Sequence, residues 1–187
     1  MTLSIKETVL IDSLLAFYKS RIEIFKDIVY QNTSLSLRLV DWLVTNYSKK
    51  YNIIYPLTKS NSNVLYFNIY LDYKNQLKAY SKKFFDPFCR QKRIIINSNS
   101  FEWTVFSDDR EINKNVEIIT TVGQMNFFKW FIQNKIFMYA LSNLQLIDND
   151  MVNTYLNKKK GKREVLSEFA VKGIYTNNKN VIIKFES

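Results

Sequence analysis

Residues 82–93 read KKFFDPFCRQKR and place three phenylalanines between two groups of basic residues. Lysine side chains contact phosphates as point charges, arginine side chains as bidentate donors, and phenylalanine rings stack on unpaired bases. The same residues also fit a helix end followed by a turn, with the lysines in solvent and the phenylalanines in the core. The segment therefore has two interpretations, a nucleic-acid contact and an ordinary structural turn.

A predicted helix before this segment extends its positive charge. Lys74, Lys78 and Lys82 are spaced by four residues and form one stripe on a regular helix, opposite the tyrosines. Such a stripe can follow a phosphate backbone, or it can be a solvated helix face. The phosphate contacts predicted in this region are Lys78, Lys82, Lys83, Arg90, Lys92 and Arg93.

A second basic cluster lies at residues 158–163, KKKGKR, where five of six residues are basic. The cluster fits a nucleic-acid contact or a nuclear import signal. It also fits a solvated helix end whose lysines interact favourably with the helix dipole. The contacts predicted here are Lys158, Lys159, Lys160, Lys162 and Arg163.

The residue types that are missing argue against an enzyme. There is no histidine, which excludes His-based acid–base chemistry and His metal ligation. The single cysteine, Cys89, forms neither an intramolecular disulfide nor a Cys-rich zinc site, and without a histidine base we expect a plain, half-buried thiol. The three glycines match neither of the common phosphate-binding motifs. We predict a protein that is not an enzyme and has no cofactor.

The carboxylates do not form a clear metal-binding pattern. Asp108, Asp109 and Glu111 cluster in one predicted loop, and Asp148 and Asp150 lie near a predicted helix start. A Mg²⁺ site needs acidic side chains that converge from separate elements, whereas aspartates at a helix start interact favourably with its dipole. We expect structural roles for these residues and no bound metal.

The net charge of +10 and the isoelectric point of about 9.5 favour an acidic partner, such as nucleic acid, an anionic membrane surface or an acidic protein. Only six of the 27 basic residues are arginine, and the abundant Asn, Lys, Ile, Tyr and Phe all have AT-rich codons. Codon bias is therefore a second explanation for the lysines. No signal-peptide pattern or apolar run of about 20 residues is visible, so we expect a soluble protein in a reducing compartment.

The elements that position these residues begin with two predicted helices. Ser4 and Glu7 fit a capping box for a helix that runs to about residue 30. Thr33 or Ser34 then fits the N-cap of a second helix, which runs to about Lys50.

The rest of the chain predicts a mixture of strands and helices. Residues 122–134 are apolar almost all round and predict a central buried helix. The remaining predictions are a loop at 56–63, strands at 64–71, 92–96, 101–106, 116–120 and 181–186, and helices at 72–85, 135–160 and 164–172.

This order of elements predicts an α+β fold in a single domain over residues 1–187. We expect a small, mostly antiparallel sheet packed with about five to six helices. The N-terminal helices lie at about 4–50, and the mixed sheet and helix core at about 64–187.

Four separated blocks resemble a known group of proteins: SLSLRLVDWLVTNYSKK (34–50), LDYKNQLKAYSKKFFDPFCR (71–90), TTVGQMNFFKWFIQN (120–134) and KREVLSEFAVKG with VIIKF (162–185). Together they resemble conserved, functionally uncharacterised proteins of nucleocytoplasmic large DNA viruses. The resemblance covers most of the chain after Thr33 and implies no site residue. It implies a viral protein with an AT-rich gene, in the virus factory of the host cytoplasm or in the virion; the basic cluster at 158–163 adds the nucleus.

We predict a non-enzymatic, basic viral accessory protein that binds DNA or RNA through Lys and Arg contacts with phosphates. The alternative is a virion structural or assembly protein, such as a minor capsid component, that binds viral structural proteins through an aromatic-rich interface. The sequence leaves open the partner, the oligomeric state, and whether the two basic clusters share a face.

Overall fold

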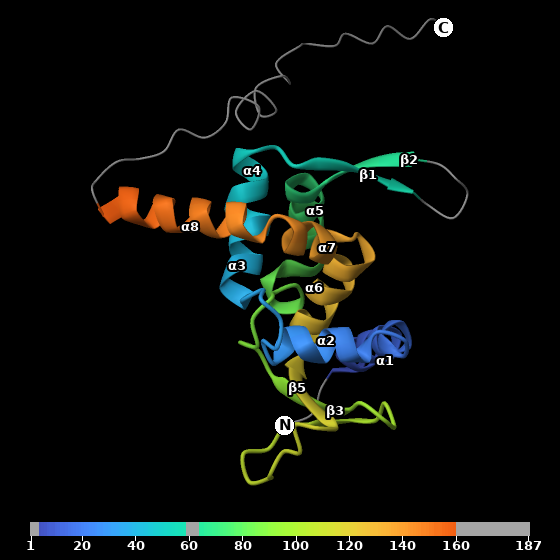
Figure 1. The fold of residues 1–187 in the computed structure, drawn as a ribbon. Helices are drawn as coiled ribbons and strands as arrows, with labels where there is room; N and C mark the ends of the chain where they lie inside the picture. The colour runs from blue at the N-terminus through green and yellow to red at the C-terminus, as the bar shows by residue number, and fades with distance from the viewer. Residues whose placement is uncertain (1–3, 59–63, 160–187) are drawn as a thin grey trace, which may run out of the picture.

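A computed structural model describes residues 4–58 and 64–159 (Figure 1). The predicted first helix is two helices, α1 (Ile5–Tyr18) and α2 (Ile22–Val29). The capping box of Ser4 and Glu7 is present as predicted. The prediction missed the turn between the helices. This turn places the ring centroids of Tyr18 and Phe25 4.4 Å apart.

The second helical segment consists of α3 (Leu37–Trp42), the π-helix η1 (Leu43–Tyr47) and α4 (Ser48–Lys50). Its N-cap is Ser36, whose hydroxyl accepts a hydrogen bond from the Leu39 amide, and not Thr33 or Ser34 as predicted. The helix begins later than predicted because Leu35 is fully buried ahead of the cap.

A two-stranded antiparallel sheet follows, formed by β1 (Ile54–Thr58) and β2 (Val64–Asn68). The sequence prediction placed part of β1 in a loop because of Pro56, but Pro56 lies within the strand, opposite Tyr66. The predicted strand at 64–71 ends at Asn68, whose side chain caps helix α5 (Ile69–Phe84).

The predicted hairpin is confirmed as β3 (Arg93–Asn97) and β4 (Trp103–Val105). On its other side β3 pairs with β5 (Glu117–Thr121), so the sheet order is β4-β3-β5 and both pairings are antiparallel. Helix α6 (Val122–Gln133) starts directly after β5, with Thr121 as its N-cap. Helices α7 (Ile136–Ser142) and α8 (Leu144–Lys159) complete the described chain, and the predicted elements at 164–172 and 181–186 lie outside it.

Helix α6 is the buried central helix that the sequence predicts, since nine of its twelve residues are buried. Its rings of Phe127, Phe128 and Phe131 join one hydrophobic cluster that draws on helices from α1 to α8 and on the three-stranded sheet. The two sheets lie at opposite ends of the molecule, with the helices between them (Figure 1). The α+β class predicted from the sequence is confirmed.

The start of α6 is fixed to the chain that leaves α5. The Asp86 amide donates to the Gly123 carbonyl at 3.3 Å, the Gln124 side chain donates to the Pro87 carbonyl at 2.9 Å, and the Asn126 side chain donates to the Phe84 carbonyl at 2.9 Å. A Cβ atom on Gly123 would lie 2.8 Å from the Lys83 carbonyl oxygen, which is closer than such atoms approach. Position 123 therefore needs glycine because of this backbone contact.

The contact predicts the effect of Gly123→Ala. Alanine normally stabilises a helix relative to glycine by about 0.5–1 kcal/mol. Here the added methyl group must displace backbone, so we expect a loss of about 1–3 kcal/mol in the free energy of unfolding, measured by urea titration. An unchanged or higher free energy of unfolding would contradict the close approach of α6 to the end of α5.

Candidate functional site

Helix α5 presents two polar surfaces, one toward α6 and one toward solvent. Asp72, Gln76 and Tyr80 follow one another at intervals of four residues and line a cleft against α6. Lys74 and Lys78 lie on another side of the helix and are exposed. One helix therefore carries both features that can bind a polar ligand.

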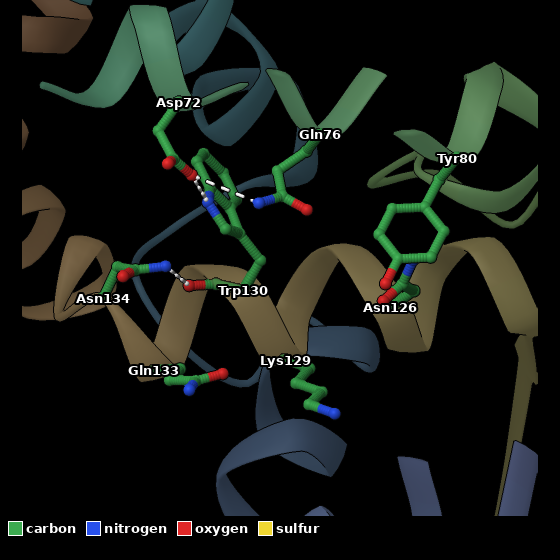
Figure 2. Close-up of a pocket in the computed structure, with 8 residues that line it drawn as sticks. All are labelled: Asp72, Gln76, Tyr80, Asn126, Lys129, Trp130, Gln133 and Asn134. Atoms are coloured by element: carbon green, nitrogen blue, oxygen red, sulfur yellow. Dashed lines mark hydrogen bonds between the residues drawn. The ribbon is translucent and has the colours of Figure 1, made fainter. Parts of the chain in front are cut away.

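The cleft between α5 and α6 has a volume of about 360 Å³ and is almost entirely polar (Figure 2). Figure 2 shows the α5 side chains above and the α6 side chains below. The lining residues are Asp72, Gln76, Tyr80, Asn126, Lys129, Trp130, Gln133 and Asn134. None of them was predicted as a site residue, although the polar spacing of 72, 76 and 80 along a helix was a usable signal.

Half of the residues that line this cleft bond to one another. The Trp130 indole N–H donates to Asp72 Oδ1 at 2.6 Å, and the Gln76 side-chain amide donates to the same oxygen at 3.4 Å. The Asn134 side chain donates to the Trp130 carbonyl, and the Tyr55 hydroxyl donates to the Asn134 carbonyl at 2.7 Å. These bonds join α5 to α6 and tie the end of α6 to β1.

The cleft can recognise a small polar group. Among the described residues that line it, Asp72 is the one carboxylate, and it is held by the Trp130 indole. Residues 4–58 and 64–159 contain no group of three or more His, Cys, Asp or Glu side chains that could hold a metal ion. Lys129 and the exposed Gln133 also line the cleft and can donate hydrogen bonds.

The turn after α5 answers for Phe85 the question that KKFFDPFCRQKR raises about its phenylalanines, whereas Phe84 and Phe88 are half-buried. Phe85 is fully buried against Tyr73, Phe127 and Trp130, with ring centroids 5.1–6.0 Å away. This ring forms core contacts and offers no face to an unpaired base. The segment folds as a helix end and a turn that are bonded to α6.

Arg90 is engaged within the turn as well. Its guanidinium donates two hydrogen bonds to the buried Asp86 carboxylate, at 2.6 and 3.0 Å, and lies 4.6 Å from the centroid of the Phe88 ring. Hydrogen bonding to Asp86 raises the pKa of Arg90 above its ordinary value. Because this pair uses the Nε and Nη2 groups of Arg90, a bidentate contact with a phosphate or a guanine that keeps the pair would have to use the remaining hydrogens on Nη1 and Nη2.

Asp41 of α3 lies close to this pair. Burial raises the pKa of Asp41 above its ordinary value, the negative charge of Asp86 raises it further, and the charges of Arg90 and Lys82 oppose the shift. Burial also raises the pKa of Tyr73 to about 12, with smaller contributions from Asp41 and Asp86. Helix α3 and the segment after α5 therefore share one electrostatic environment.

The other predicted contacts near α5 differ in how far they are engaged. Lys83 forms an ion pair with Glu7 at 3.6 Å, and the Arg93 guanidinium lies 4.7 Å from the Phe106 ring centroid. Lys78 and Lys82 are exposed, and Lys92 is half-buried. The predicted regular stripe is wrong at its end, because Ser81 has a left-handed φ of 60° and kinks α5 before Lys82.

The second predicted cluster lies at the end of the described chain. Lys158 and Lys159 are the last residues of α8. Lys160, Lys162 and Arg163 lie outside the described residues. Whether the two clusters share a face therefore stays open, and these five contacts stay predictions.

Positive charge is concentrated in two segments that touch each other. Residues 36–50 and 69–93 together contain ten Lys and Arg against three Asp, whereas the other described residues contain ten Lys and Arg against eleven Asp and Glu. The Lys49 ammonium lies 5.6 Å from the Tyr70 ring centroid, which places the segments side by side. We call the two segments together the basic region.

The comparison with known sequences identifies the family. A family model described as "Family of unknown function (DUF7197)" matches residues 3–183. The chain belongs to this family. "Uncharacterized protein L507" of Acanthamoeba polyphaga mimivirus is 39% identical over 142 residues, which are 75% of this chain and 51% of that protein. The chain thus spans about half the length of this curated relative.

The viral resemblance predicted from the sequence is confirmed, since mimivirus is a nucleocytoplasmic large DNA virus and both the DUF7197 family and the relative are uncharacterised. No solved structure matches the chain. Within the described part of this family member, no helix has the length and apolar character that a membrane span requires.

Two further predictions for this DUF7197 member concern single side chains. Cys89 is half-buried as predicted; burial raises the pKa of its thiol, although the positive charge of Arg93 opposes the shift. Asp150, predicted as an acid near a helix start, instead lies within α8 and is buried. It accepts hydrogen bonds from Trp42, Lys50 and Tyr51 at 2.8–2.9 Å, contacts that the sequence could not reveal because they span about 100 positions.

The raised pKa of Asp41 predicts a pH-dependent effect of Asp41→Asn. The folded state binds a proton at Asp41 more tightly than the unfolded chain, so stability falls as pH rises from the ordinary Asp pKa through the folded one. We expect Asp41→Asn to raise the melting temperature at pH 7, and the gain to vanish below about pH 3.8. The control is Asp12→Asn, the same substitution at an exposed carboxylate of α1. A lower melting temperature for Asp41→Asn at pH 7 would contradict the assignment.

Proposed function

We propose that this protein is a non-enzymatic viral accessory protein that binds nucleic acid through phosphate contacts on the basic region. The observation that carries the proposal is the charge distribution. Residues 36–50 and 69–93 hold an excess of seven positive charges, and the remaining described residues are almost neutral. A surface with such a local excess attracts a polyanion.

The carboxylates within the basic region do little to offset this excess at the surface. Asp72 is held by the Trp130 indole, Asp86 is buried against Arg90, and Asp41 is half-buried. In contrast, Lys74, Lys78 and Lys82 are exposed on α5. Neither Lys74 nor Lys78 has an ion-pair partner among the described residues. These three lysines form the centre of the proposed interface.

The chemistry of these groups supports backbone binding in preference to base reading. Lysine contacts phosphate as a point charge, and it carries no bidentate fork for a base edge. Arg90, which could supply such a fork, is engaged by Asp86. Phe85 is in the core, and the half-buried rings of Phe84 and Phe88 each carry a cation over one face, Lys83 and Arg90. We therefore expect binding that depends strongly on salt and weakly on sequence.

The test compares two triple variants with the same change in net charge. Lys74→Gln, Lys78→Gln and Lys82→Gln together should weaken binding to a fluorescent duplex at least tenfold at about 100 mM salt and reduce the slope of log affinity against log salt by about 2.7. The control changes Lys6, Lys19 and Lys114 to Gln, which are exposed lysines outside the basic region.

The two variants distinguish a local site from general attraction. An equal loss in both would assign binding to net charge alone and would reject the basic region as the interface. No binding of the natural chain at about 50 mM salt would reject the proposed function itself. The same assay on a variant with Lys158, Lys159, Lys160, Lys162 and Arg163 changed to Gln tests the second predicted cluster.

A second candidate function is assembly with a viral structural protein, and the observation that favours it is the exposed apolar surface of α8. Leu146, Val152 and Leu156 are exposed along this helix, which packs on α3 through Tyr155 and points outward at its C-terminal end (Figure 1). Apolar anchors of this kind are typical of protein interfaces. Both candidate functions imply a place in the virus factory of the host cytoplasm or in the virion.

Replacement of Leu146, Val152 and Leu156 by Ser should abolish co-sedimentation with purified virion structural proteins and leave nucleic-acid binding unchanged. The interaction should persist at about 500 mM salt, because apolar contacts are not screened. Co-sedimentation that is lost at high salt, or that survives the triple replacement, would reject this candidate.

A further inference from the structure

The β1–β2 hairpin carries no charged residue in either described strand, IYPLT or VLYFN. One face packs on the body, where Tyr55 stacks on Tyr139 with ring centroids 5.7 Å apart. The other face is open: the Tyr66 side chain is 80% exposed and Val64 is 55% exposed. The hairpin extends away from the helices (Figure 1).

The hydrogen-bond pattern shows which backbone groups point to the free edges. The Ile69 amide donates to the Ile53 carbonyl at 3.3 Å, and these two residues continue the register that pairs Ile54 with Asn68. Hydrogen-bonded and non-hydrogen-bonded pairs alternate along an antiparallel ladder. The pairs of odd-numbered residues, such as Tyr55 with Phe67, are therefore hydrogen-bonded. Pro56 and Tyr66 form a non-hydrogen-bonded pair.

This alternation makes the two edges of the hairpin unequal. The N–H and C=O groups of Val64 and Tyr66 point away from β1, toward the free edge of β2. On the opposite edge the middle outward position of β1 is Pro56, which has no N–H group. Within the described chain no strand pairs with the free edge of β2. An edge without charge or proline is competent to pair with another strand.

We propose that a second copy of this chain pairs with the free edge of β2, antiparallel, around a two-fold axis through Tyr66. Residues directly opposite each other in an antiparallel pair lie on the same face of the sheet. The open faces of the two hairpins therefore lie on the same side of the joined sheet only in every second register. Among those registers, the one centred on Tyr66 pairs all five residues of β2. It places Val64 opposite Asn68 and Leu65 opposite Phe67 of the second copy.

The lack of charge on the described strands favours a second copy over a charged partner. Two chains of net charge +10 repel each other, and the described strands of the hairpin let them meet without placing like charges in contact. A charged partner would find no complementary group on this edge. An identical strand also supplies the same length and the same alternation of faces. Because a five-residue strand is short beside a standard interface of about 800 Å² per partner, we expect weak, concentration-dependent dimers.

The first experiment traps the register as a disulfide. In a background of Cys89→Ser, which leaves no other thiol, Tyr66→Cys places two cysteines opposite each other. The Cα atoms of such a hydrogen-bonded pair are about 5.5 Å apart, within the range of a disulfide. The control, Val64→Cys, is an exposed position on the same strand, but its two copies would be about 14 Å apart. We expect oxidation to crosslink Tyr66→Cys efficiently and Val64→Cys only at the rate of random collisions.

The second experiment removes the edge hydrogen bonds. Tyr66→Pro deletes the outward N–H group but no hydrogen bond to β1, so the hairpin should remain folded by circular dichroism. Tyr66→Val is the control that keeps the N–H group. Sedimentation equilibrium should show concentration-dependent dimers for the natural chain and for Tyr66→Val, and a monomer for Tyr66→Pro.

Three results would overturn the proposal. The first is a natural chain that stays monomeric at about 500 µM, a concentration at which weak dimers form. The second is equal crosslinking of the two cysteine variants. The third is a dimer that survives Tyr66→Pro. None of these measurements depends on nucleic-acid binding, so the proposal stands or falls independently of the proposed function.

Discussion

The close backbone contact between Gly123 and Lys83 fixes the arrangement on which the two candidate sites on α5 depend. It brings the first turn of α6 against the last turn of α5, where a side chain at position 123 would collide with a carbonyl oxygen. Hydrogen bonds from Gln124 and Asn126 then hold the turn after α5 in place. Helix α6 can remain almost fully buried because its polar side chains are satisfied by this turn.

The same contact gives α5 two different surfaces. Since α5 lies against α6, the Trp130 indole can donate a hydrogen bond to Asp72, and both residues line the cleft. On the opposite side of α5, Lys74 and Lys78 are exposed to solvent in the described part of the chain. Helix α3 lies near the C-terminal end of α5, where the charges of Asp86, Arg90 and Lys82 affect the pKa of Asp41. The polar cleft and the basic region are thus two consequences of one packing arrangement.

Local signals predicted much of this fold, and long-range contacts account for the errors. The capping box at Ser4, the β3–β4 hairpin and the buried helix α6 follow from short patterns that tertiary structure did not override. Strand β1 was missed because Pro56 is tolerated at a position whose N–H group would face away from β2, which no local pattern reveals. At the site, the basic residues were visible in the sequence. The engagement of Arg90 by Asp86 and the kink at Ser81 were not visible.

The concentration of lysine bears on whether codon bias explains the basic charge. Bias toward AT-rich codons raises lysine at every tolerant position alike, so it predicts a similar excess over the whole surface. Outside the basic region the described residues hold ten basic and eleven acidic side chains, which is no excess. Within it, the three aspartates are buried, half-buried or bonded to an indole, while Lys74, Lys78 and Lys82 face solvent. Codon bias would explain the choice of lysine over arginine, but it would not explain where the unbalanced charge lies.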